Sequence, residues 1–251
     1  MEAATIVKRI RATDGLTRTD LARLADVSPS TVSRIENGSL EPTWSTLQKL
    51  LSAAGMVING TTVVSAGDPT AVTAARALLE KNPDAAPSEW VKRWERTGWA
   101  KLQSAEDVLA LAITAGVAGQ FARRARKPLY VRMRDQSKWQ QLPAALSEAG
   151  IEYAISGLVA TSGDRTTTTA SAPIVYVRDP RAVARELDLV EVPPLQGTML
   201  VPPAANELEG AEEEDGLWFV TRAQAMLDAF ASGGRQPDKA ESVAMSWPVA
   251  L

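Results

Sequence analysis

The stretch that decides the fold is residues 16–55, LTRTDLARLADVSPSTVSRIENGSLEPTWSTLQKLLSAAG. Thr17, with Asp20 three residues later, is typical of a capping box and predicts that a helix begins here. Ser28, followed by proline, predicts the first turn of the next helix. Gly38 predicts the end of that helix, because glycine readily takes the left-handed conformation that closes helices. Two short helices joined by a tight turn form a helix-turn-helix unit.

Apolar residues support this interpretation, since they recur at the spacing that places them on one face of a helix. They fall in a first helix (Ile6, Val7, Ile10), in the two helices just described (Leu21, Ala22, Leu24, Ala25; Val32, Ile35) and in a fourth (Leu47, Leu50, Leu51, Ala54). We therefore predict an all-α helix-turn-helix domain over residues 1–60.

The same stretch resembles the Cro/XRE (lambda-repressor-like) family of DNA-binding domains. The segments LARLADVS and TVSRIENG and the later pattern P-x-x-x-T-L-x-K-L match best. The resemblance implies that the third helix lies in the major groove, with its early residues toward the base edges. The family usually has glutamine at the start of the second helix. Arg18 stands there in this chain and keeps a phosphate donor, but it does not imply the family's brace to the third helix.

Arg34 lies four residues after Ser30, on the same face of the third helix. An arginine paired bidentately with guanine is the commonest specific base contact, so we expect Arg34 to read a base of a double-stranded operator. The alternative is an ordinary solvated charge. The full set of expected DNA-binding residues is Arg18, Thr19, Ser28, Ser30, Thr31, Ser33 and Arg34. Because such domains commonly bind two half-sites one helical turn apart, we expect a homodimer or a tandem arrangement.

Three neighbouring residues are expected to have structural roles. Trp44 is predicted to pack against the helix that follows it, the alternative being stacking on a sugar or phosphate. Glu36 and Asn37 are predicted to hold the loop after the third helix.

The 251 residues include no cysteine and no histidine. Disulfides, thiolate metal sites and cysteine nucleophiles are therefore excluded, and the usual general base and commonest metal ligand are missing. We expect no enzyme activity, no catalytic residues, no metal and no cofactor. The net charge of −3 is unusual for a DNA-binding protein, but the local distribution of charge decides binding.

Neither the most apolar stretch nor the first residues of the sequence predict an association with a membrane. The apolar stretch at residues 108–117 is too short to span a bilayer, and the first residues lack the basic and apolar regions of a signal peptide. We expect a cytoplasmic protein without a membrane partner.

Residues 61–127 are predicted to form a helical linking region, and alternating Thr and Val at its start predict a short strand. Trp90, Trp94 and Trp99 lie close together in SEWVKRWERTGW. One interpretation is an aromatic and basic surface that binds nucleic acid or a partner. The interpretation that we favour is that the tryptophans pack between domains.

A basic segment closes the linking region. It is a possible secondary nucleic-acid contact beside the operator, the alternative being a solvated helix end where cations suit the helix dipole. Its residues are Arg123, Arg124, Arg126 and Lys127.

Residues 128–251 alternate short apolar strands with helices that begin at Asp179, Thr221 and Pro237. This mixture predicts an α/β (α+β) domain with an open sheet. The acidic run Glu207–Asp215 is predicted to be an exposed loop. The fold class is therefore multi-domain, with an all-α N-terminal domain and an α/β C-terminal domain.

The C-terminal part, residues 129–245, resembles the C-terminal domain of AbiEi-type antitoxins from type IV toxin–antitoxin systems. The segments that carry the resemblance are YAISGLVAT, PIVYVRD, DPRAVARELDLVEV and DGLWFVTRAQAMLDAFASGGRQPDKAE. It implies an autorepressing transcriptional regulator that opposes a toxin of nucleotidyltransferase type. Two alternatives remain open: a regulator whose C-terminal domain senses a small-molecule effector, and an enzyme fused to a DNA-binding head.

Overall fold

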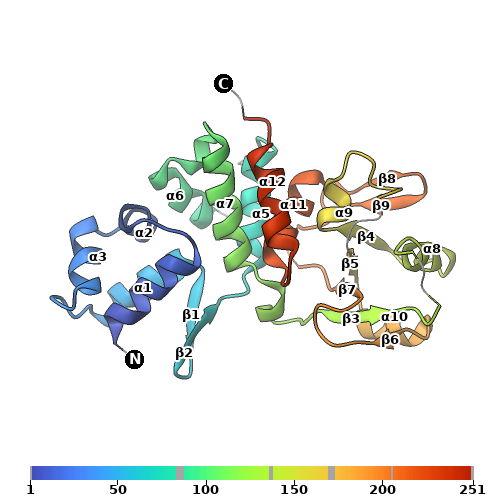
Figure 1. The fold of residues 1–251 in the computed structure, drawn as a ribbon, viewed down its shortest axis with the longest axis horizontal. Coiled ribbons are helices and arrows are strands. Elements are labelled where there is room, and N and C mark those ends of the chain that lie inside the picture. The colour runs from blue at the N-terminus through green and yellow to red at the C-terminus, as the bar shows by residue number, and fades with distance from the viewer. Residues whose placement is uncertain (1, 83–87, 136–137, 169–172, 205, 250–251) are drawn as a thin grey trace.

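The computed structural model describes residues 2–82, 88–135, 138–168, 173–204 and 206–249. The chain is elongated, with a small helical part at one end and a large sheet at the other (Figure 1). The helical part contains α1 (Ala3–Thr13), α2 (Arg18–Ala25), α3 (Pro29–Glu36) and α4 (Trp44–Ala53), followed by a hairpin of β1 (Met56–Asn59) and β2 (Thr62–Ser65).

Cap geometry confirms the helix boundaries predicted in the N-terminal part. Thr17 and Asp20 form a reciprocal capping box at the start of α2. At the start of α3 the hydroxyl of Ser28 accepts a hydrogen bond from the amide of Thr31. Gly38 follows α3 with a φ of +71°, a conformation that costs other residues free energy. The predicted apolar faces of the four helices are buried.

The middle of the chain forms a second helical layer. It consists of α5 (Pro69–Leu79), α6 (Ser88–Thr97) and α7 (Ala105–Ala118), with the short helices η2 (Trp99–Lys101) and η3 (Phe121–Arg123). Helices α5 and α7 pack against each other and against α11 (Arg222–Ala231), and α7 also contacts α12 (Gln236–Met245) (Figure 1). The helices of the predicted linking region thus share a core with the last two helices of the chain.

Among the described residues, Ala105–Arg123 is one segment long and apolar enough to cross a membrane, judged by length and composition alone. Half of its most apolar part is buried inside the structure. Since α7 lies between α5, α11 and α12, its apolar composition fits the core helix of the second layer.

A mixed sheet forms the other end of the molecule. Within the described residues it has seven strands in the order β6-β3-β7-β5-β4-β9-β8. The strands are β3 (Leu129–Arg132), β4 (Tyr153–Ser156), β5 (Ile174–Val177), β6 (Val190–Glu191), β7 (Thr198–Val201), β8 (Glu212–Glu214) and β9 (Leu217–Phe219). The pairs β5–β7 and β4–β9 are parallel and the other four are antiparallel.

Helices connect the strands and cover the sheet. They are α8 (Gln141–Glu148), α9 (Leu158–Thr161) and α10 (Pro180–Glu186), and α11 packs against α9 and β4. The strands β4, β5 and β7 are buried along their whole length, as expected for the centre of a sheet covered by helices. The predicted α/β class of the C-terminal part is confirmed.

The prediction that Glu207–Asp215 is an exposed loop is confirmed only in part, since most of these residues are exposed. Glu207 is fully buried, and residues 212–214 form the edge strand β8. The carboxylates of Glu212 and Glu214 each lie 2.6 Å from the guanidinium of Arg165. A three-residue edge strand without apolar side chains gives no alternating pattern, so its charges alone suggested a solvated loop.

Candidate nucleic-acid interface

Three hydroxyl groups gather at the N-terminus of α3. Oγ of Ser28 lies 2.9 Å from Oγ of Ser30 and 2.7 Å from Oγ1 of Thr31. Ser28 and Ser30 are exposed and Thr31 is half-buried. A hydroxyl has one donor and two acceptor positions, so the cluster keeps capacity for phosphate oxygens or base edges. The backbone amide of Ser30 adds one donor at the same place, since Pro29 has no N–H and the amide of Thr31 is bonded to Ser28.

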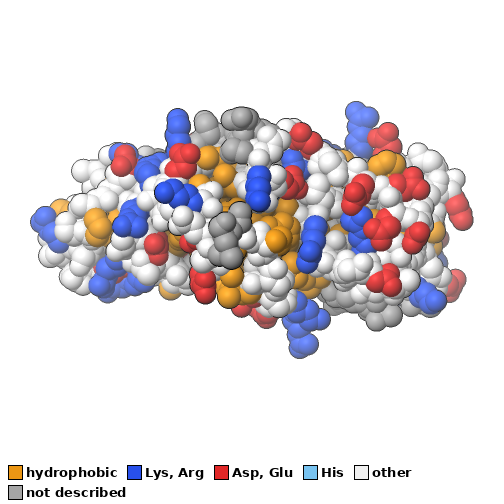
Figure 2. Space-filling model, turned by 90° about the horizontal axis from the view of Figure 1, so that it is seen from above, with side chains coloured by type: hydrophobic (Ala, Val, Ile, Leu, Met, Phe, Trp, Pro, Cys, Tyr) orange, Lys and Arg blue, Asp and Glu red, His pale blue; other side chains and the backbone are white. Residues whose placement is uncertain are grey.

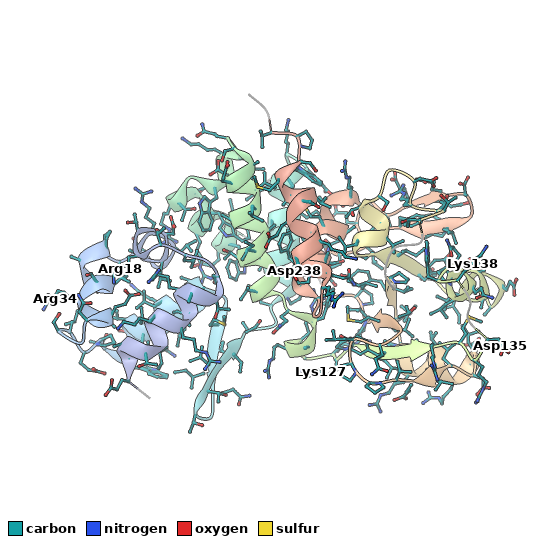
Figure 3. All side chains as sticks on the ribbon, in the orientation of Figure 1. Arg18, Arg34, Lys127, Asp135, Lys138 and Asp238 are labelled. Carbon is teal, nitrogen blue, oxygen red and sulfur yellow. The ribbon has the colours of Figure 1, made fainter. Side chains whose placement is uncertain are left out.

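One turn further along α3, Arg34 lies at the extreme end of the molecule and points away from it (Figure 3). It shares the exposed face of the helix with Ser30. Within the part of the chain that the structure describes, its guanidinium makes no ion pair and no hydrogen bond. It is therefore available for two parallel hydrogen bonds to guanine.

The remaining predicted contacts lie beside these. Thr19 is exposed in the first turn of α2, and Ser33 is half-buried on the flank of α3. Of the two, only Thr19 presents its side chain openly to solvent.

Arg18 fixes the position of α3 through Glu36. Nε of Arg18 donates to Oε2 of Glu36 over 2.5 Å, and Nε of Arg11 donates to Oε1 over 2.8 Å. Because the three residues belong to α2, α3 and α1, one buried carboxylate joins three helices. The sequence left open whether Arg18 braces the third helix, and the structure provides that brace. The prediction that Glu36 holds the following loop is wrong, because its side chain is turned inward.

The electrostatics of Glu36 favour its charged form. Burial by itself raises the pKa of this carboxyl group, but the hydrogen bonds and charges of Arg11 and Arg18 outweigh burial and lower it. Arg18 remains half-exposed, so its terminal nitrogens can still approach a phosphate.

Comparison with known families agrees with this geometry. A family model described as a helix-turn-helix domain matches residues 2–58, which span α1 to α4 and most of β1. Residues 2–58 are a helix-turn-helix domain. Its recognition helix is α3, the helix that carries Ser30 and Arg34 on its open face. Neither the curated proteins nor the solved structures include a match to this chain.

Trp44 is a surface residue of the helix-turn-helix domain, so the prediction that it packs against the following helix is wrong. Its side chain is 60% exposed. Trp44 is the first residue of α4, where the Cα–Cβ bond tilts toward the N-terminus and carries the ring past the end of the core. The exposed ring lies next to Thr43 and is therefore a candidate for stacking on a sugar or phosphate of DNA, which is the alternative that the sequence favoured less.

The three tryptophans of the middle region are buried, which confirms their packing role. The rings of Trp90 and Trp94 stack with centroids 5.5 Å apart, and Trp99 is buried beside them. Nε1 of Trp90 donates to the carboxylate of Asp68 at the start of α5, and α6 also contacts α2 of the helix-turn-helix domain.

Arg93 of α6 binds a second helix of the helix-turn-helix domain. Its Nη1 donates to the carbonyl oxygen of Ser52 over 2.7 Å and its Nη2 to Oγ of Ser52 over 2.9 Å. Since Ser52 lies in the last turn of α4, the helix-turn-helix domain is held to the second helical layer through two of its helices. No sequence motif marks Arg93 for this role.

The predicted secondary contact is only partly on the surface. Arg124 is buried, lies over the ring of Phe121 and forms an ion pair with Glu207, so its assignment as a nucleic-acid contact is wrong. Buried apolar and acidic groups from distant segments enclose it, which the local run of basic residues cannot show.

The other three cations of this segment, at residues 123, 126 and 127, are exposed. Arg126 and Lys127 donate to the backbone oxygens of Arg178 and Ala122. Lys127 lies under the middle of the molecule, far along its length from Arg34 (Figure 3). This segment is therefore separated along the molecule from the open face of α3.

Charge is distributed unevenly along the chain. Residues 1–127 contain 17 Lys and Arg against 13 Asp and Glu, whereas residues 128–251 contain 10 against 17. The negative total thus belongs to the C-terminal part. Figure 2 shows the same separation, with acidic side chains gathered toward the sheet end of the face in view. The acidic net charge does not oppose DNA binding at the helix-turn-helix end.

A polar network is buried between the sheet and the helices. The carboxyl group of Asp228 accepts hydrogen bonds from Ser156 at 2.6 Å, Tyr176 at 2.9 Å and Gln224 at 2.8 Å. Burial, reinforced by the charge of Glu207, raises the pKa of Asp228 to about 7. The group is closed off from solvent and hydrogen-bonded on both oxygens, which is the arrangement of a structural network. In the described part of the chain no group of three or more acidic side chains could hold a metal ion.

Proposed function

We propose that this protein is a sequence-specific DNA-binding transcriptional regulator that represses its own operon. The observation that carries the proposal is the open face of α3, where Arg34, without a partner among the described residues, lies one turn from the hydroxyl cluster of Ser28, Ser30 and Thr31. This face offers a guanidinium that can read a base beside hydroxyl groups that can bind phosphates. In major-groove recognition, base contacts give specificity and phosphate contacts position the protein.

A footprint on the DNA upstream of the protein's own gene tests this function. The full chain should protect one short site or two half-sites about one helical turn apart. A variant with Arg34→Ala and Ser30→Ala should lose that protection while keeping the far-ultraviolet circular dichroism of the unaltered chain. Uniform weak protection of all DNA, unaffected by the two substitutions, would contradict sequence-specific binding.

We further propose that the regulator is the antitoxin of a type IV toxin–antitoxin system. The support is the resemblance of residues 129–245 to the C-terminal domain of AbiEi-type antitoxins. The partner would be a nucleotidyltransferase-type toxin encoded beside it. Induction of that neighbouring gene should arrest growth, and co-expression of this chain should relieve the arrest. Continued arrest, with the chain present at equal level, would refute the antitoxin role and leave operator binding untouched.

In this proposal the chain is a cytoplasmic, non-enzymatic homodimer. The buried network around Asp228 has a structural role in this proposal, because its polar groups are hydrogen-bonded to one another away from solvent. Sedimentation of the free chain tests the dimer, and a single monomeric species at operator-saturating concentration would refute it.

A further inference from the structure

A cavity of about 760 Å³ lies where the helix-turn-helix domain meets the rest of the molecule. One wall comes from α1 and the β1–β2 hairpin. The other comes from α7, η3, α11 and α12, elements that lie together in the middle of the molecule (Figure 1). The volume is in the range of small-molecule sites, which are commonly found between domains.

The walls of the cavity combine apolar and polar surface, and the apolar share is somewhat larger. Apolar side chains from both sides contribute, and they are Ile10, Met56, Val63, Ile113, Val117 and Phe230. A ligand that fills this space must bring an apolar body, because displacing water from such walls is the main favourable contribution to binding.

Two arginines add charge to these walls. Arg9 comes from α1 and Arg123 from η3, so one cation belongs to each side of the junction. Among the residues that the structure describes, neither guanidinium forms an ion pair or a side-chain hydrogen bond. Glu241 is the one carboxylate in the lining that the structure describes, which leaves a positive balance. Free guanidinium groups over an apolar floor favour a carboxylate or another small anion.

Close backbone contacts fix the wall of the cavity that α7, η3 and α11 form. A Cβ atom added at Gly116 of α7 would lie 2.5 Å from Cβ of Phe230, so α7 and α11 touch directly behind the wall. A Cβ atom added at Gly67 would lie 2.4 Å from the backbone carbon of Arg123, so η3 is fixed against the segment after β2. A fixed wall loses less conformational entropy on binding than one that must rearrange around its ligand.

We propose that this cavity binds a small organic anion with an apolar body, and that its occupancy changes the operator affinity of the helix-turn-helix domain. The second part rests on the proposed regulatory function. A ligand held by Arg9 and Arg123 together would link α1 of the DNA-binding domain to η3 of the body. The two states would therefore differ in how the domain is held, which is the differential interaction that an effector requires.

Hexanoate, octanoate and decanoate are suitable probes, with 1-octanol as the neutral probe of matched length. Titration calorimetry on the full chain without DNA should show saturable binding of octanoate, and weaker binding of 1-octanol. Arg9→Gln with Arg123→Gln should weaken octanoate binding at least tenfold. The matched control, Lys8→Gln with Arg181→Gln, removes the same charge outside the cavity and should leave binding unchanged. Glu241→Gln should bind octanoate at least as tightly as the unaltered chain.

Operator affinity is then measured by fluorescence anisotropy with and without saturating octanoate. A shift of at least threefold is expected for the unaltered chain and for the control pair, and no shift for the Arg9/Arg123 variant. Absence of saturable binding for all three carboxylates, equal loss in the control pair, or weaker binding after Glu241→Gln would overturn the site. Octanoate binding without any shift in operator affinity would overturn the regulatory part. Because the ligand titration uses no DNA, failure of operator binding itself would be seen separately in the footprint.

Discussion

Nε of Arg18 lies 2.5 Å from Oε2 of Glu36, and this contact ties the first turn of α2 to the last turn of α3. The same carboxylate holds Arg11 of α1. The orientation of the recognition helix therefore depends on an ion-pair network at its C-terminal end, while its N-terminal end is left open for DNA.

Removal of the Arg34 guanidinium should weaken recognition at one base pair. Arg34→Ala should cost about 1–3 kcal/mol of operator binding and relax discrimination at that position, because a bidentate pair with guanine is lost. Anisotropy measurements over a set of operators with single base changes would show it. Arg181→Ala removes an exposed arginine of α10 at the sheet end and should leave both affinity and discrimination unchanged. Equal losses in the two variants would point to a purely electrostatic role for Arg34.

Glu36→Gln should destabilise the helix-turn-helix domain by about 1–3 kcal/mol at neutral pH, since two charge-assisted hydrogen bonds are lost. The partial exposure of Arg18 keeps the figure below that of a fully buried pair. The folded pKa of Glu36 lies below its ordinary value of 4.5. Its stabilising contribution is therefore present above pH 4.5 and is lost as the pH falls through the folded pKa. Denaturant unfolding should show a difference in the free energy of unfolding between Glu36→Gln and the unaltered chain at pH 7. This difference should disappear near pH 3. Glu41→Gln, at an exposed position, serves as the control. A free-energy difference for Glu36→Gln that does not change with pH would contradict the ion-pair account.

Asp14→Asn should stabilise the protein. The carboxyl group is buried, neither of its oxygens has a hydrogen-bond partner among the described residues, and burial raises its pKa to about 8. The unfolded chain ionises near 3.8 while the folded chain holds the proton, so stability falls as the pH rises from about 4 to about 8. The variant should melt at a higher temperature than the unaltered chain at pH 8, with the difference shrinking toward pH 4. Asp135→Asn, at an exposed position, should show no such trend. A lower melting temperature for Asp14→Asn at pH 8 would reveal a partner for the carboxylate.

Arg124→Met should destabilise the body of the protein by about 3–5 kcal/mol, because it leaves Glu207 buried without its cation. The exposed neighbour Arg123→Met should cost little. Urea unfolding followed by circular dichroism would separate the two. Retention of full stability by Arg124→Met would place Arg124 among the surface cations after all.

Gly55→Ala and Gly60→Ala compare a packed glycine with an open one. Both residues have nearly the same backbone conformation, with φ of +62° and +61°, so each should pay about 1–2 kcal/mol for the added Cβ. At Gly55 that Cβ would also lie 2.3 Å from Cβ of Ala118, whereas nothing lies within 4 Å at Gly60. Gly55→Ala should therefore lose markedly more stability in thermal unfolding. Equal losses would show that the domain does not rest on α7.

The local structure of the N-terminal part could be predicted because its signals are local. Capping residues such as Thr17 and Ser28 act on amides within the next turn, and apolar periodicity within one helix reports the buried face. The same holds for the helix that begins at Asp179, whose carboxylate accepts from the amides of Arg181 and Ala182. The family match over residues 2–58 then agrees with what these signals indicate.

Most of the wrong predictions concern residues at which segments distant in the sequence meet. Arg124 looks like its exposed neighbours until Glu207, more than 80 residues later, is brought beside it. Glu36 resembles a loop-holding residue until Arg11 and Arg18 converge on it. The prediction that Trp44 is packed was wrong for a different reason. The spacing of apolar residues along a helix does not show where the buried core ends. The proposed anion cavity could not be found from sequence, because its two arginines lie more than 100 residues apart.

The placement of charge along the molecule bears on how the protein sits on an operator. Arg34 lies at one tip and the excess of carboxylates belongs to the opposite, sheet-containing part. DNA phosphates attract the guanidinium of Arg34 and repel the carboxylates of the sheet-containing part. A bound chain would therefore stand upright on the duplex, with the sheet projecting outward and its surface free for a further molecule even while the operator is occupied.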